Sequence, residues 1–191
     1  MLRSKDFTLL ITFFFVGCGA TGTSAPTTVA KDPAEFTKPQ QKDILDAINR
    51  ARAKRRDCHD GKGLVGPAVS LSWNEELYLS AYEHSFDMAQ SDTFGHEGSG
   101  TQYDSTGSNL GISSLFFDRI EANGYVEYRS IGENIAGGQK SVNDVMEALL
   151  NSPAHCTNIM SDSFREVGVA VVSNIDSEYG IYWTQNFGAK K

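Results

Sequence analysis

Apolar residues recur every three or four positions in four segments of the chain, which is the spacing of one face of an α-helix. Each of these segments begins beside a proline or a short polar residue. Such residues favour a helix start, because proline has no amide hydrogen to leave unpaired and short polar side chains accept from the first free amides. The predicted helix starts are Pro39, Asn74, Ser113 or Ser114, and Ser141, and Gly124 is expected to stop the third helix.

Other segments have the composition of β-strands. Residues 69–73 and 167–171 alternate larger apolar residues with small or polar ones, and residues 179–187 are rich in aromatic and β-branched residues. Residues 174–180 are expected to form a hairpin-type loop between the last two strands. Residues 125–130 are expected to form only a short extended link.

The first 18 residues have the features of an export signal. Arg3 and Lys5 give a positive start, and the apolar run that follows is shorter than the ~20 residues of a bilayer-spanning helix. Residues 15–18 resemble a bacterial lipobox, in which Cys18 is lipidated and becomes the new N-terminus. The alternative is a secretory signal cleaved after another small residue, with Cys18 discarded. In both cases the mature protein is exported.

Residues 19–38 are rich in Thr, Ala, Gly, Ser and Pro and have no apolar period. This composition predicts a flexible linker, which a lipid-anchored domain would need. Residues 39–191 remain, and roughly 150 residues suit a single domain with one core.

The formal net charge of −7 argues against a nucleic-acid-binding protein, because phosphate contacts need clustered positive charge. It also disfavours general attraction to anionic lipid, so that membrane contact is expected only through a lipid anchor. The first helix nevertheless ends in a basic run. The favoured interpretation is a solvated helix end whose cations meet the negative end of the helix dipole. The alternative is a patch for an anionic headgroup or wall polymer. The basic residues are Arg50, Arg52, Lys54, Arg55 and Arg56.

Two histidines contrast in their sequence context. His84 falls on the apolar stripe of the second predicted helix, where a hydrogen-bonded core residue is expected. His96 lies in a loop between Gly95 and Gly98, and glycines let a backbone approach another group closely. His96 is therefore the better candidate for a functional residue.

Several short motifs along the chain together resemble those of the CAP superfamily, also called SCP-like proteins. This superfamily includes cysteine-rich secretory proteins, venom antigens, plant pathogenesis-related proteins and many exported bacterial proteins. The order and spacing of the motifs carry the resemblance from about residue 40 to residue 188. The motifs are Leu71-Ser72-Trp73-Asn74, His84-Ser85-Phe86-Asp87-Met88-Ala89, Phe94-Gly95-His96, Gly124-Tyr125, Gly132-Glu133-Asn134-Ile135-Ala136, Ser152-Pro153-Ala154-His155, Asn158-Ile159-Met160, Val167-Gly168-Val169 and Tyr182-Trp183-Thr184-Gln185-Asn186-Phe187-Gly188.

The resemblance implies an α+β fold, a three-layer α-β-α sandwich around a central antiparallel sheet. It also implies a cleft lined by two histidines and two glutamates. His96, Glu133 and His155 match three of these residues. The fourth position falls near Ser152, and Glu147, although close in sequence, belongs to another part of the fourth helix.

Two imidazoles and a carboxylate are suitable ligands for a divalent ion such as zinc, with an open position left for water. The two imidazole ligands would be His96 and His155. Without a metal, Glu133 and a histidine would be a general acid–base pair. The resemblance does not decide between these roles, because some relatives bind metal and others bind sterols or other lipids.

Two of the three cysteines are expected to form a disulfide, and the third needs a separate explanation. An exported protein lies where disulfides form, so we predict a Cys58–Cys156 bridge that ties the end of the first helix to the turn that carries His155. Cys18 is then lipidated or removed.

Three functions stay open at this point. The first is an exported CAP-domain protein of a bacterial envelope, lipid-anchored or secreted, whose cleft binds a small ligand, a lipid or a divalent metal ion. The second is a metal-assisted or acid–base hydrolase acting on an envelope polymer or peptide. The third is an interaction protein in which the same residues form a purely structural polar cluster.

Overall fold

A computed structural model describes residues 38–191. The predicted signal segment, the lipidation site at Cys18 and nearly all of the predicted linker lie outside these residues. In chain order the elements are α1 (Lys38–Arg52), β1 (Arg56–Asp57), β2 (Leu64–Val65), β3 (Ser72–Trp73), α2 (Glu75–Ser91), α3 (Ser105–Leu110), α4 (Phe116–Ala122), β4 (Tyr128–Gly137), α5 (Val142–Asn151), α6 (Pro153–Met160), β5 (Glu166–Ser173) and β6 (Ile181–Lys190).

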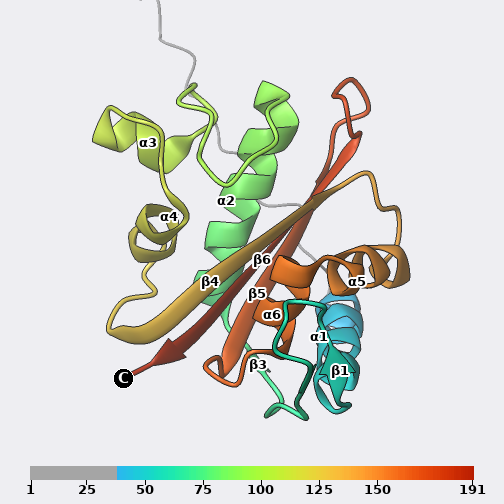
Figure 1. Cartoon of the computed structure of the whole chain (residues 1–191). Helices are drawn as coiled ribbons and strands as arrows, with labels where there is room; N and C mark the ends of the chain where they lie inside the picture. The colour runs from blue at the N-terminus through green and yellow to red at the C-terminus, as the bar shows by residue number, and fades with distance from the viewer. Residues whose placement is uncertain (1–37) are drawn as a thin grey trace, which may run out of the picture. The chain divides into compact units, whose positions relative to one another are not determined.

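Four of the strands form one sheet in the order β3-β5-β6-β4. Strand β6 pairs antiparallel with both β5 and β4, and only the two-residue edge strand β3 runs parallel to its neighbour β5. Helix α2 packs on β5 and β6, whereas α1, α5 and α6 pack together on the other side (Figure 1). The predicted α-β-α sandwich with a largely antiparallel sheet is confirmed.

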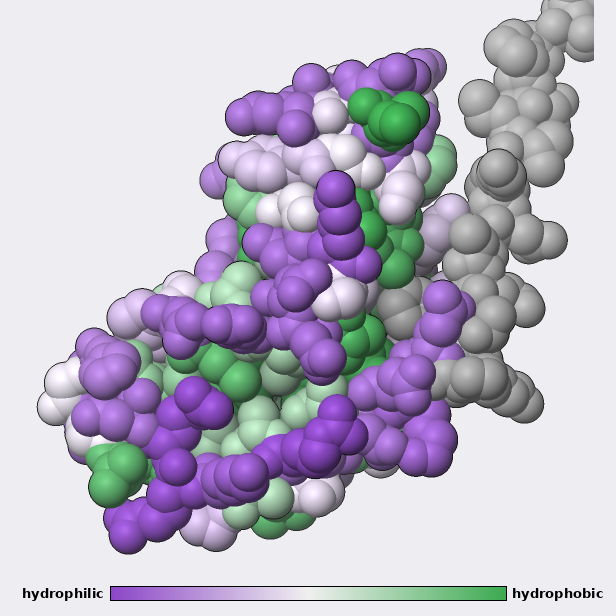
Figure 2. All heavy atoms as spheres, turned by 90° about the vertical axis from the view of Figure 1, so that its right-hand side faces the viewer, coloured by the Kyte–Doolittle hydropathy of each residue, from purple (hydrophilic) through white to green (hydrophobic). Residues whose placement is uncertain are grey.

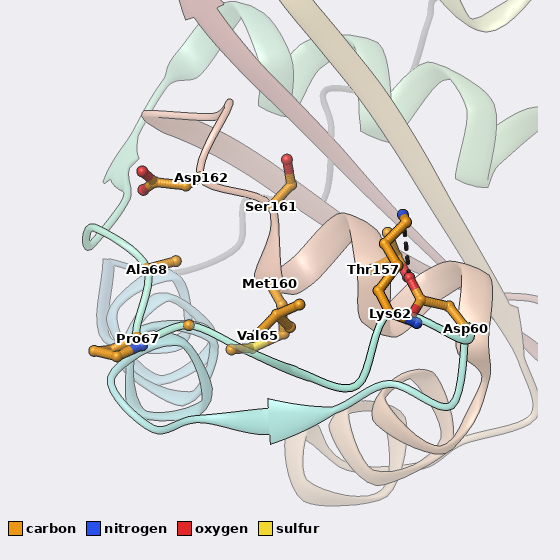
Figure 3. A pocket seen from close by; sticks show the side chains of 10 residues that line it. Asp60, Lys62, Val65, Pro67, Ala68, Thr157, Met160, Ser161 and Asp162 are labelled. Atoms are coloured by element: carbon orange, nitrogen blue, oxygen red, sulfur yellow. Dashed lines mark hydrogen bonds and ion pairs between the residues drawn. The ribbon is translucent and has the colours of Figure 1, made fainter.

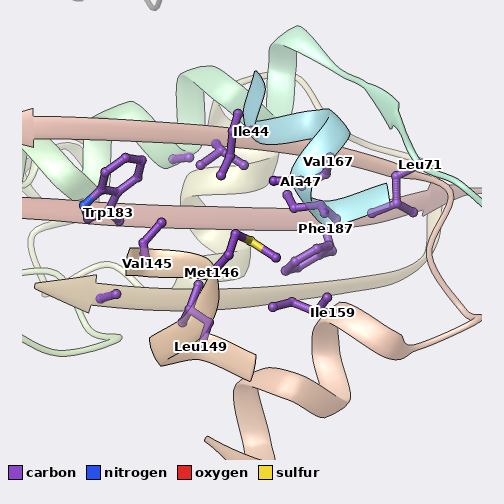
Figure 4. Packing of buried hydrophobic residues seen from close by; sticks show 14 of the residues in the cluster. Ile44, Ala47, Leu71, Val145, Met146, Leu149, Ile159, Val167, Trp183 and Phe187 are labelled. Atoms are coloured by element: carbon purple, nitrogen blue, oxygen red, sulfur yellow. The ribbon is translucent and has the colours of Figure 1, made fainter. Parts of the chain in front are cut away.

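The main core fills the space between the sheet and the layer of α1, α5 and α6. Ile44 of α1, Leu149 of α5 and Ile159 of α6 meet Val167 and Phe187 of the sheet there (Figure 4). All five are almost fully buried. On the outer side of this layer hydrophilic residues dominate, and hydrophobic residues appear mainly in the depressions between them (Figure 2).

Helix α2 approaches the opposite face of the sheet unusually closely. A Cβ atom at Gly168 would lie only 2.0 Å from the backbone nitrogen of Tyr78 in α2. The alternation of valine and small residues in β5 therefore has a reason. Val167 and Val169 fill the main core, and Gly168 between them leaves room for the helix backbone.

Several predicted element boundaries are confirmed. The Asn74 side chain accepts from the amide of Leu77 at the start of α2, and the Ser141 side chain accepts from the amide of Asp144 in α5. The start of the third predicted helix is wrong. Leu115, not Ser113 or Ser114, is the N-cap of α4, and Asp118 accepts from the amide of Leu115.

The basic end of α1 also differs from the prediction. Arg52 is completely buried, and its guanidinium donates to the backbone oxygens of Val69, Ile159 and Ser161. The favoured interpretation of a solvated helix end is therefore wrong for Arg52. This residue instead ties α1 to the C-terminal end of α6.

Candidate functional site

Glu133 lies on β4, on the face of the sheet that α2 covers, and its carboxylate is almost completely hydrogen-bonded. Oε1 is 2.9 Å from His96 Nδ1, and Arg119 Nη2 lies 3.1 Å from Oε2 and 3.3 Å from Oε1. Asn186, paired with Glu133 across the sheet, donates to Oε2 at 3.2 Å in the amide orientation that satisfies both of its polar atoms. With its side chain only 2% exposed, Glu133 has little capacity left for an outside ligand.

Arg119 holds both Glu133 and His96 in place. Besides the Glu133 carboxylate, Nη2 donates to the backbone oxygen of His96 at 2.9 Å. Nη1 donates to the backbone oxygen and to Oγ of Ser114, and Ser114 Oγ donates in turn to Asp104 at 2.7 Å. A buried polar network therefore runs from Asp104 through Ser114 and Arg119 to Glu133 and His96.

This environment keeps Glu133 ionised. Burial alone would disfavour the charged carboxylate. The hydrogen bond from His96 and the charge and hydrogen bonds of Arg119 outweigh burial, so that the pKa of Glu133 lies below its ordinary value. A carboxylate held in this state acts as a fixed hydrogen-bond acceptor for the His96 imidazole.

The two histidines nearest Glu133 have different surroundings. His84 is fully buried, and its Nε2 lies 2.8 Å from the backbone oxygen of Gly95, which agrees with the predicted core role. Burial, only partly opposed by Glu133, lowers the pKa of His84 to about 4, so the ring is neutral at neutral pH. The His96 side chain is 53% exposed, and Nδ1 is the ring nitrogen that meets Glu133, so that Nε2 is left for another partner.

His155 reaches the site from the other side of the sheet. Successive residues of a strand point to opposite faces, so Asn134 points away from Glu133 and toward α6. Asn134 Nδ2 donates to the backbone oxygen of His155, and Asn158 Nδ2 donates to Asn134 Oδ1 and to the backbone oxygen of Glu133. These bonds hold α6 against the edge strand β4.

No hydrogen bond within residues 38–191 joins the His155 side chain to His96 or Glu133. Its half-buried imidazole has a lowered pKa, mainly because of burial and to a lesser degree because of the neighbouring His96. The structure therefore brings His96 and Glu133 into contact and places His155 as a neutral imidazole within electrostatic reach of His96.

The position expected for a second glutamate contributes no carboxylate. Ser152 lies between α5 and α6, and its side chain makes no capping hydrogen bond at the start of α6. Glu147 is an exposed residue of α5. Within residues 38–191, the carboxylate that contacts His96 is that of Glu133.

A divalent metal fits only part of the predicted ligand set. Glu133 does not fit as a direct ligand, because its oxygens already accept hydrogen bonds and a guanidinium lies beside them. The His96 imidazole does fit, because a metal-binding histidine commonly donates its other ring nitrogen to a carboxylate, as His96 donates to Glu133. Within residues 38–191, no three or more His, Cys, Asp or Glu residues are grouped to hold a metal ion.

The predicted disulfide is confirmed. Cys58 and Cys156 are bonded, with their Cα atoms 5.5 Å apart. The bond joins the segment that follows α1 to α6, next to His155.

Sequence reasoning missed Arg119, Ser114 and Asp104. The position of Arg119 carried a signal, since it lies three residues after Phe116 and next to Ile120, on the apolar side of a short helix. An arginine in such a place needs a buried partner. The identity of that partner, Glu133, depends on the folded chain and was not visible in the local sequence.

A three-layer sandwich with a histidine–glutamate pair at the edge of its sheet defines a CAP-type, or SCP-like, domain. The sequence model of the cysteine-rich secretory protein family matches residues 45–187, and the chain belongs to this CAP family. Within residues 38–191, no helix is both long enough and apolar enough to cross a membrane.

Curated relatives come from Bacillus subtilis. The uncharacterized protein YkwD is 31% identical over 175 residues, which are 89% of this chain and 57% of YkwD. The uncharacterized membrane protein YlbC is 29% identical over 77% of this chain and 34% of its own length. The chain therefore spans about half or less of these relatives.

Solved structures show the same fold. An outer surface protein from Borrelia burgdorferi superposes with a TM-score of 0.60 at 21% identity, over 81% of this chain and 96% of that one. An extracellular protein containing an SCP domain from Bacillus anthracis gives a TM-score of 0.55 at 23% identity, over 82% of this chain and 45% of that one.

Proposed function

We propose that this chain is an exported CAP-domain protein that binds a small ligand, a lipid or a divalent metal ion through His96 and His155. The observation that carries the proposal is the hydrogen bond between His96 Nδ1 and the buried Glu133, made by an imidazole that is 53% exposed. The protein fixes one ring nitrogen and leaves the other available to an outside partner.

The neighbouring His84 argues against a purely structural role for His96. Both histidines lie beside Glu133, but His84 is fully buried and its Nε2 is hydrogen-bonded to the backbone oxygen of Gly95. A histidine whose only role was to donate a hydrogen bond to the Glu133 carboxylate would not need a half-exposed side chain. The surrounding network of Asp104, Ser114 and Arg119 supports an ordered site in which His96 is the outward-facing member.

Zinc is the metal that this donor set suits best, because it prefers imidazole nitrogen and accepts low coordination numbers. His96 and His155 would hold it, and Glu133 would orient His96 without binding the ion. A bound zinc would supply a Lewis acid that lowers the pKa of a coordinated water molecule.

The test is calorimetric titration of the full-length chain with zinc. We expect saturable binding by the wild type and its loss in His96→Ala and in His155→Ala, with both variants folded by circular dichroism. His59→Ala is the matched control, because His59 is 80% exposed and contacts neither residue. Absence of binding by the wild type, or equal loss in His59→Ala, would contradict the metal site and leave only organic ligands.

The same geometry supports a hydrolase as the second candidate. A histidine whose Nδ1 is held by a carboxylate presents Nε2 as a general base, and Glu133 would fix its tautomer. An envelope polymer or peptide would be the substrate. If this is correct, Glu133→Gln lowers turnover of a peptide or cell-wall substrate in the fraction that remains folded, whereas a binding protein shows no turnover to lose.

The proposed location is the bacterial cell envelope, with a lipid anchor at Cys18 and residues 19–38 as the linker. The secretory family and the Cys58–Cys156 disulfide support export. Labelling of cells with a clickable fatty acid tests the anchor. Incorporation is expected in the wild type and not in Cys18→Ala, and an unlabelled wild type would favour the secreted alternative.

A further inference from the structure

Strand β4 lies at an edge of the sheet, and alternate residues of its backbone point away from β6. In an antiparallel pair, residues alternate between those that direct their N–H and C=O groups to the neighbouring strand and those that direct them outward. The amide of Gly138, the residue after β4, donates to the backbone oxygen of Ile181 at 2.9 Å, which sets the phase of this alternation. Near this end of β4, the even-numbered residues therefore bond to β6 and the odd-numbered residues point outward.

The outward-pointing residues are Glu133, Ile135 and Gly137. Asn158 Nδ2 of α6 donates to the backbone oxygen of Glu133 at 3.1 Å, which agrees with this direction. For Ile135 and Gly137, neither the N–H nor the C=O group has a hydrogen-bond partner within residues 38–191. An unpaired edge of this kind is a template for a further strand.

The unpaired edge lies between the two site histidines. His96 reaches Glu133 on the face of β4 that α2 covers, and the helix that carries His155 is held to Asn134 on the other face. After burial, the charge of His96 also lowers the pKa of His155, so the two imidazoles lie within electrostatic reach of each other. Rings held on opposite faces of a sheet come together around its edge, which here is the outer edge of β4.

The surroundings of this edge favour a single added chain. Helix α6 packs on β4 from one face and α4 from the other, so that β4 lies between them (Figure 1). Gly137 is half-buried and Gly138 is exposed, and neither has a side chain to cover the edge, whereas Ile135 is 5% exposed. A second folded copy would have to insert its own sheet between the two helices. One added strand occupies only about 4.8 Å.

Two exposed aromatic rings lie at the Gly137 end, on the face of β4 that carries His96. The Tyr179 ring lies against Gly137, where a Cβ atom would be 2.8 Å from Cγ of the ring. The ring centroids of Phe94 and Tyr179 are 4.9 Å apart, and Phe94 is 44% and Tyr179 39% exposed. A strand added to β4 would place the side chain opposite Gly137 on these rings. The rings favour an apolar or aromatic residue there.

The cavity beside the end of α6 is a weaker candidate. It measures about 370 Å³ and lies between the loop after Cys58 and the last turn of α6 (Figure 3). Its carboxylates have basic partners, because Asp60 Oδ2 lies 3.2 Å from Lys62 Nζ and Asp162 Oδ1 lies 3.7 Å from Arg165 Nη1. The cavity therefore offers no net charge to select a ligand, whereas the β4 edge offers donors and acceptors at a defined spacing.

We propose that the β4 edge binds an extended peptide as an added β-strand, through hydrogen bonds to the N–H and C=O groups of Ile135 and Gly137. These groups repeat every two residues, at about 6.8 Å, a spacing that an extended backbone matches and a small organic ligand lacks. Alternate peptide side chains would face Phe94 and His96, and the others would face α6 and His155. The proposal names the ligand class of the histidine site and so rests on the proposed function.

The test is a titration of the ¹⁵N-labelled full-length chain with the peptide N-acetyl-Ser-Val-Tyr-Val-Ser-amide, in EDTA to exclude metal. Hydrogen-bond formation should move the amide protons of Ile135 and Gly137 downfield in a saturable way. The amides of Asn134 and Ala136 point to β6 and are the internal control, which should move much less. No shift at Ile135 and Gly137 would overturn the proposal. The same shifts without peptide, on raising the protein concentration, would assign the edge to a second copy and overturn it as well.

Two N-methylated peptides test whether the backbone is what binds. One carries the methyl group on the tyrosine amide and the other on the amide of the valine that follows. Neighbouring amides of a strand point in opposite directions, so only one of the two faces β4. One methyl group should therefore weaken binding roughly 10-fold and the other less than about 3-fold. Equal effects of the two methyl groups would contradict strand addition.

Phe94→Ala should weaken binding of the tyrosine peptide about 5-fold, through the loss of an aromatic contact. Phe117→Ala removes a similarly exposed ring from α4, is the matched control and should leave the affinity unchanged. An equal loss in both variants would overturn this placement of the peptide. Peptide binding without zinc binding would keep the β4 site and remove the metal, and zinc binding without peptide binding would do the reverse.

Discussion

Two arginines are buried within residues 38–191, Arg52 and Arg119, and their surroundings differ. Arg119 is 1% exposed and faces the Glu133 carboxylate, so its charge is neutralised by an opposite charge. Arg52 is 0% exposed and donates only to backbone oxygens. Burial lowers the pKa of Arg52 to about 10, partly opposed by the charge of Asp162, yet the group stays charged at neutral pH.

The difference shows two ways in which a buried cation serves a site. Arg119 pairs with the Glu133 carboxylate and holds it ionised for His96. Arg52 has no such partner, and its hydrogen bonds to backbone oxygens join α1 to the loop at Val69 and to the end of α6. Removing either arginine should destabilise the fold, but only for Arg119 should the damage depend on a particular carboxylate.

The largest effect is expected for Arg119→Met. It leaves the Glu133 carboxylate buried without its cation, and breaking such a pair costs about 3–5 kcal/mol. Urea unfolding measures the loss. Adding Glu133→Gln should recover part of it, because the unpaired charge is then gone.

Arg165→Met is the control for Arg119→Met, since Arg165 is 41% exposed and its ion pair with Asp162 is long, at 3.7 Å. It should change stability by less than about 1 kcal/mol. An Arg119→Met variant as stable as this control, or no recovery by Glu133→Gln, would show that the charge pair does not hold this region together.

A smaller loss is expected for Arg52→Met, about 2–3 kcal/mol. It removes charge-assisted bonds to carbonyl oxygens but leaves no opposite charge buried and unpaired. Adding Asp162→Asn should recover less than about 0.5 kcal/mol, because Asp162 does not contact Arg52. The same double-mutant cycle in urea measures both values. Recovery as large as that in the Arg119–Glu133 cycle would abolish the distinction between the two arginines.

The pH dependence of the unfolding free energy should report on Asp104, which lies at the end of the Arg119 network away from Glu133. Burial would raise the pKa of Asp104, but hydrogen bonds from Ser114, Gly107 and Gly100 outweigh it and lower the pKa below its ordinary value. The native state therefore binds the proton less readily than the unfolded state. The stabilisation is complete above the unfolded pKa of about 3.9 and is lost as the pH falls through the lower, folded value.

Asp104→Asn should thus lower stability by about 1–3 kcal/mol at pH 6. The difference from wild type should shrink steadily below about pH 4, where the wild-type carboxylate becomes protonated. Unfolding free energies measured from pH 6 down to about pH 2 test this. A constant difference across the range would mean that the hydrogen bonds, and not the charge, account for the contribution of Asp104.

Local features of the fold were predictable because neighbouring residues determine them. The cap of α2 at Asn74 and the cap of α5 at Ser141 depend on residues only three positions away. Strand β4 was underestimated, because Gly132, Glu133 and Asn134 have low strand propensity. Their extended conformation comes from pairing with β6, some fifty residues later in the chain.

Helix α3 was missed for a related reason. Its sequence of serine, threonine, glycine and asparagine reads as a turn, and the helix depends on Asp104 as its N-cap and Gly111 as its left-handed C-cap. The candidate site was predictable as a set of residues through the CAP motifs. The hydrogen bonding within the site was not predictable. The Glu133 carboxylate accepts from Arg119 and Asn186, and these residues reach it only in the folded chain.

The smallest effect concerns Ser152, where a second glutamate was expected. Ser141 and Ser152 are both N-cap residues, but only the Ser141 side chain accepts from a helix amide, that of Asp144 at 3.2 Å. Ser141→Ala should therefore cost about 1 kcal/mol, whereas Ser152→Ala should stay within about 0.5 kcal/mol of wild type. Thermal and urea unfolding of the two variants side by side would measure the difference. Equal losses would show that the Ser152 hydroxyl has a stabilising partner, and the position would then belong to the ordered site after all. A silent Ser152→Ala that also leaves zinc binding unchanged would confine the site to His96, His155 and the carboxylate that orients one of them.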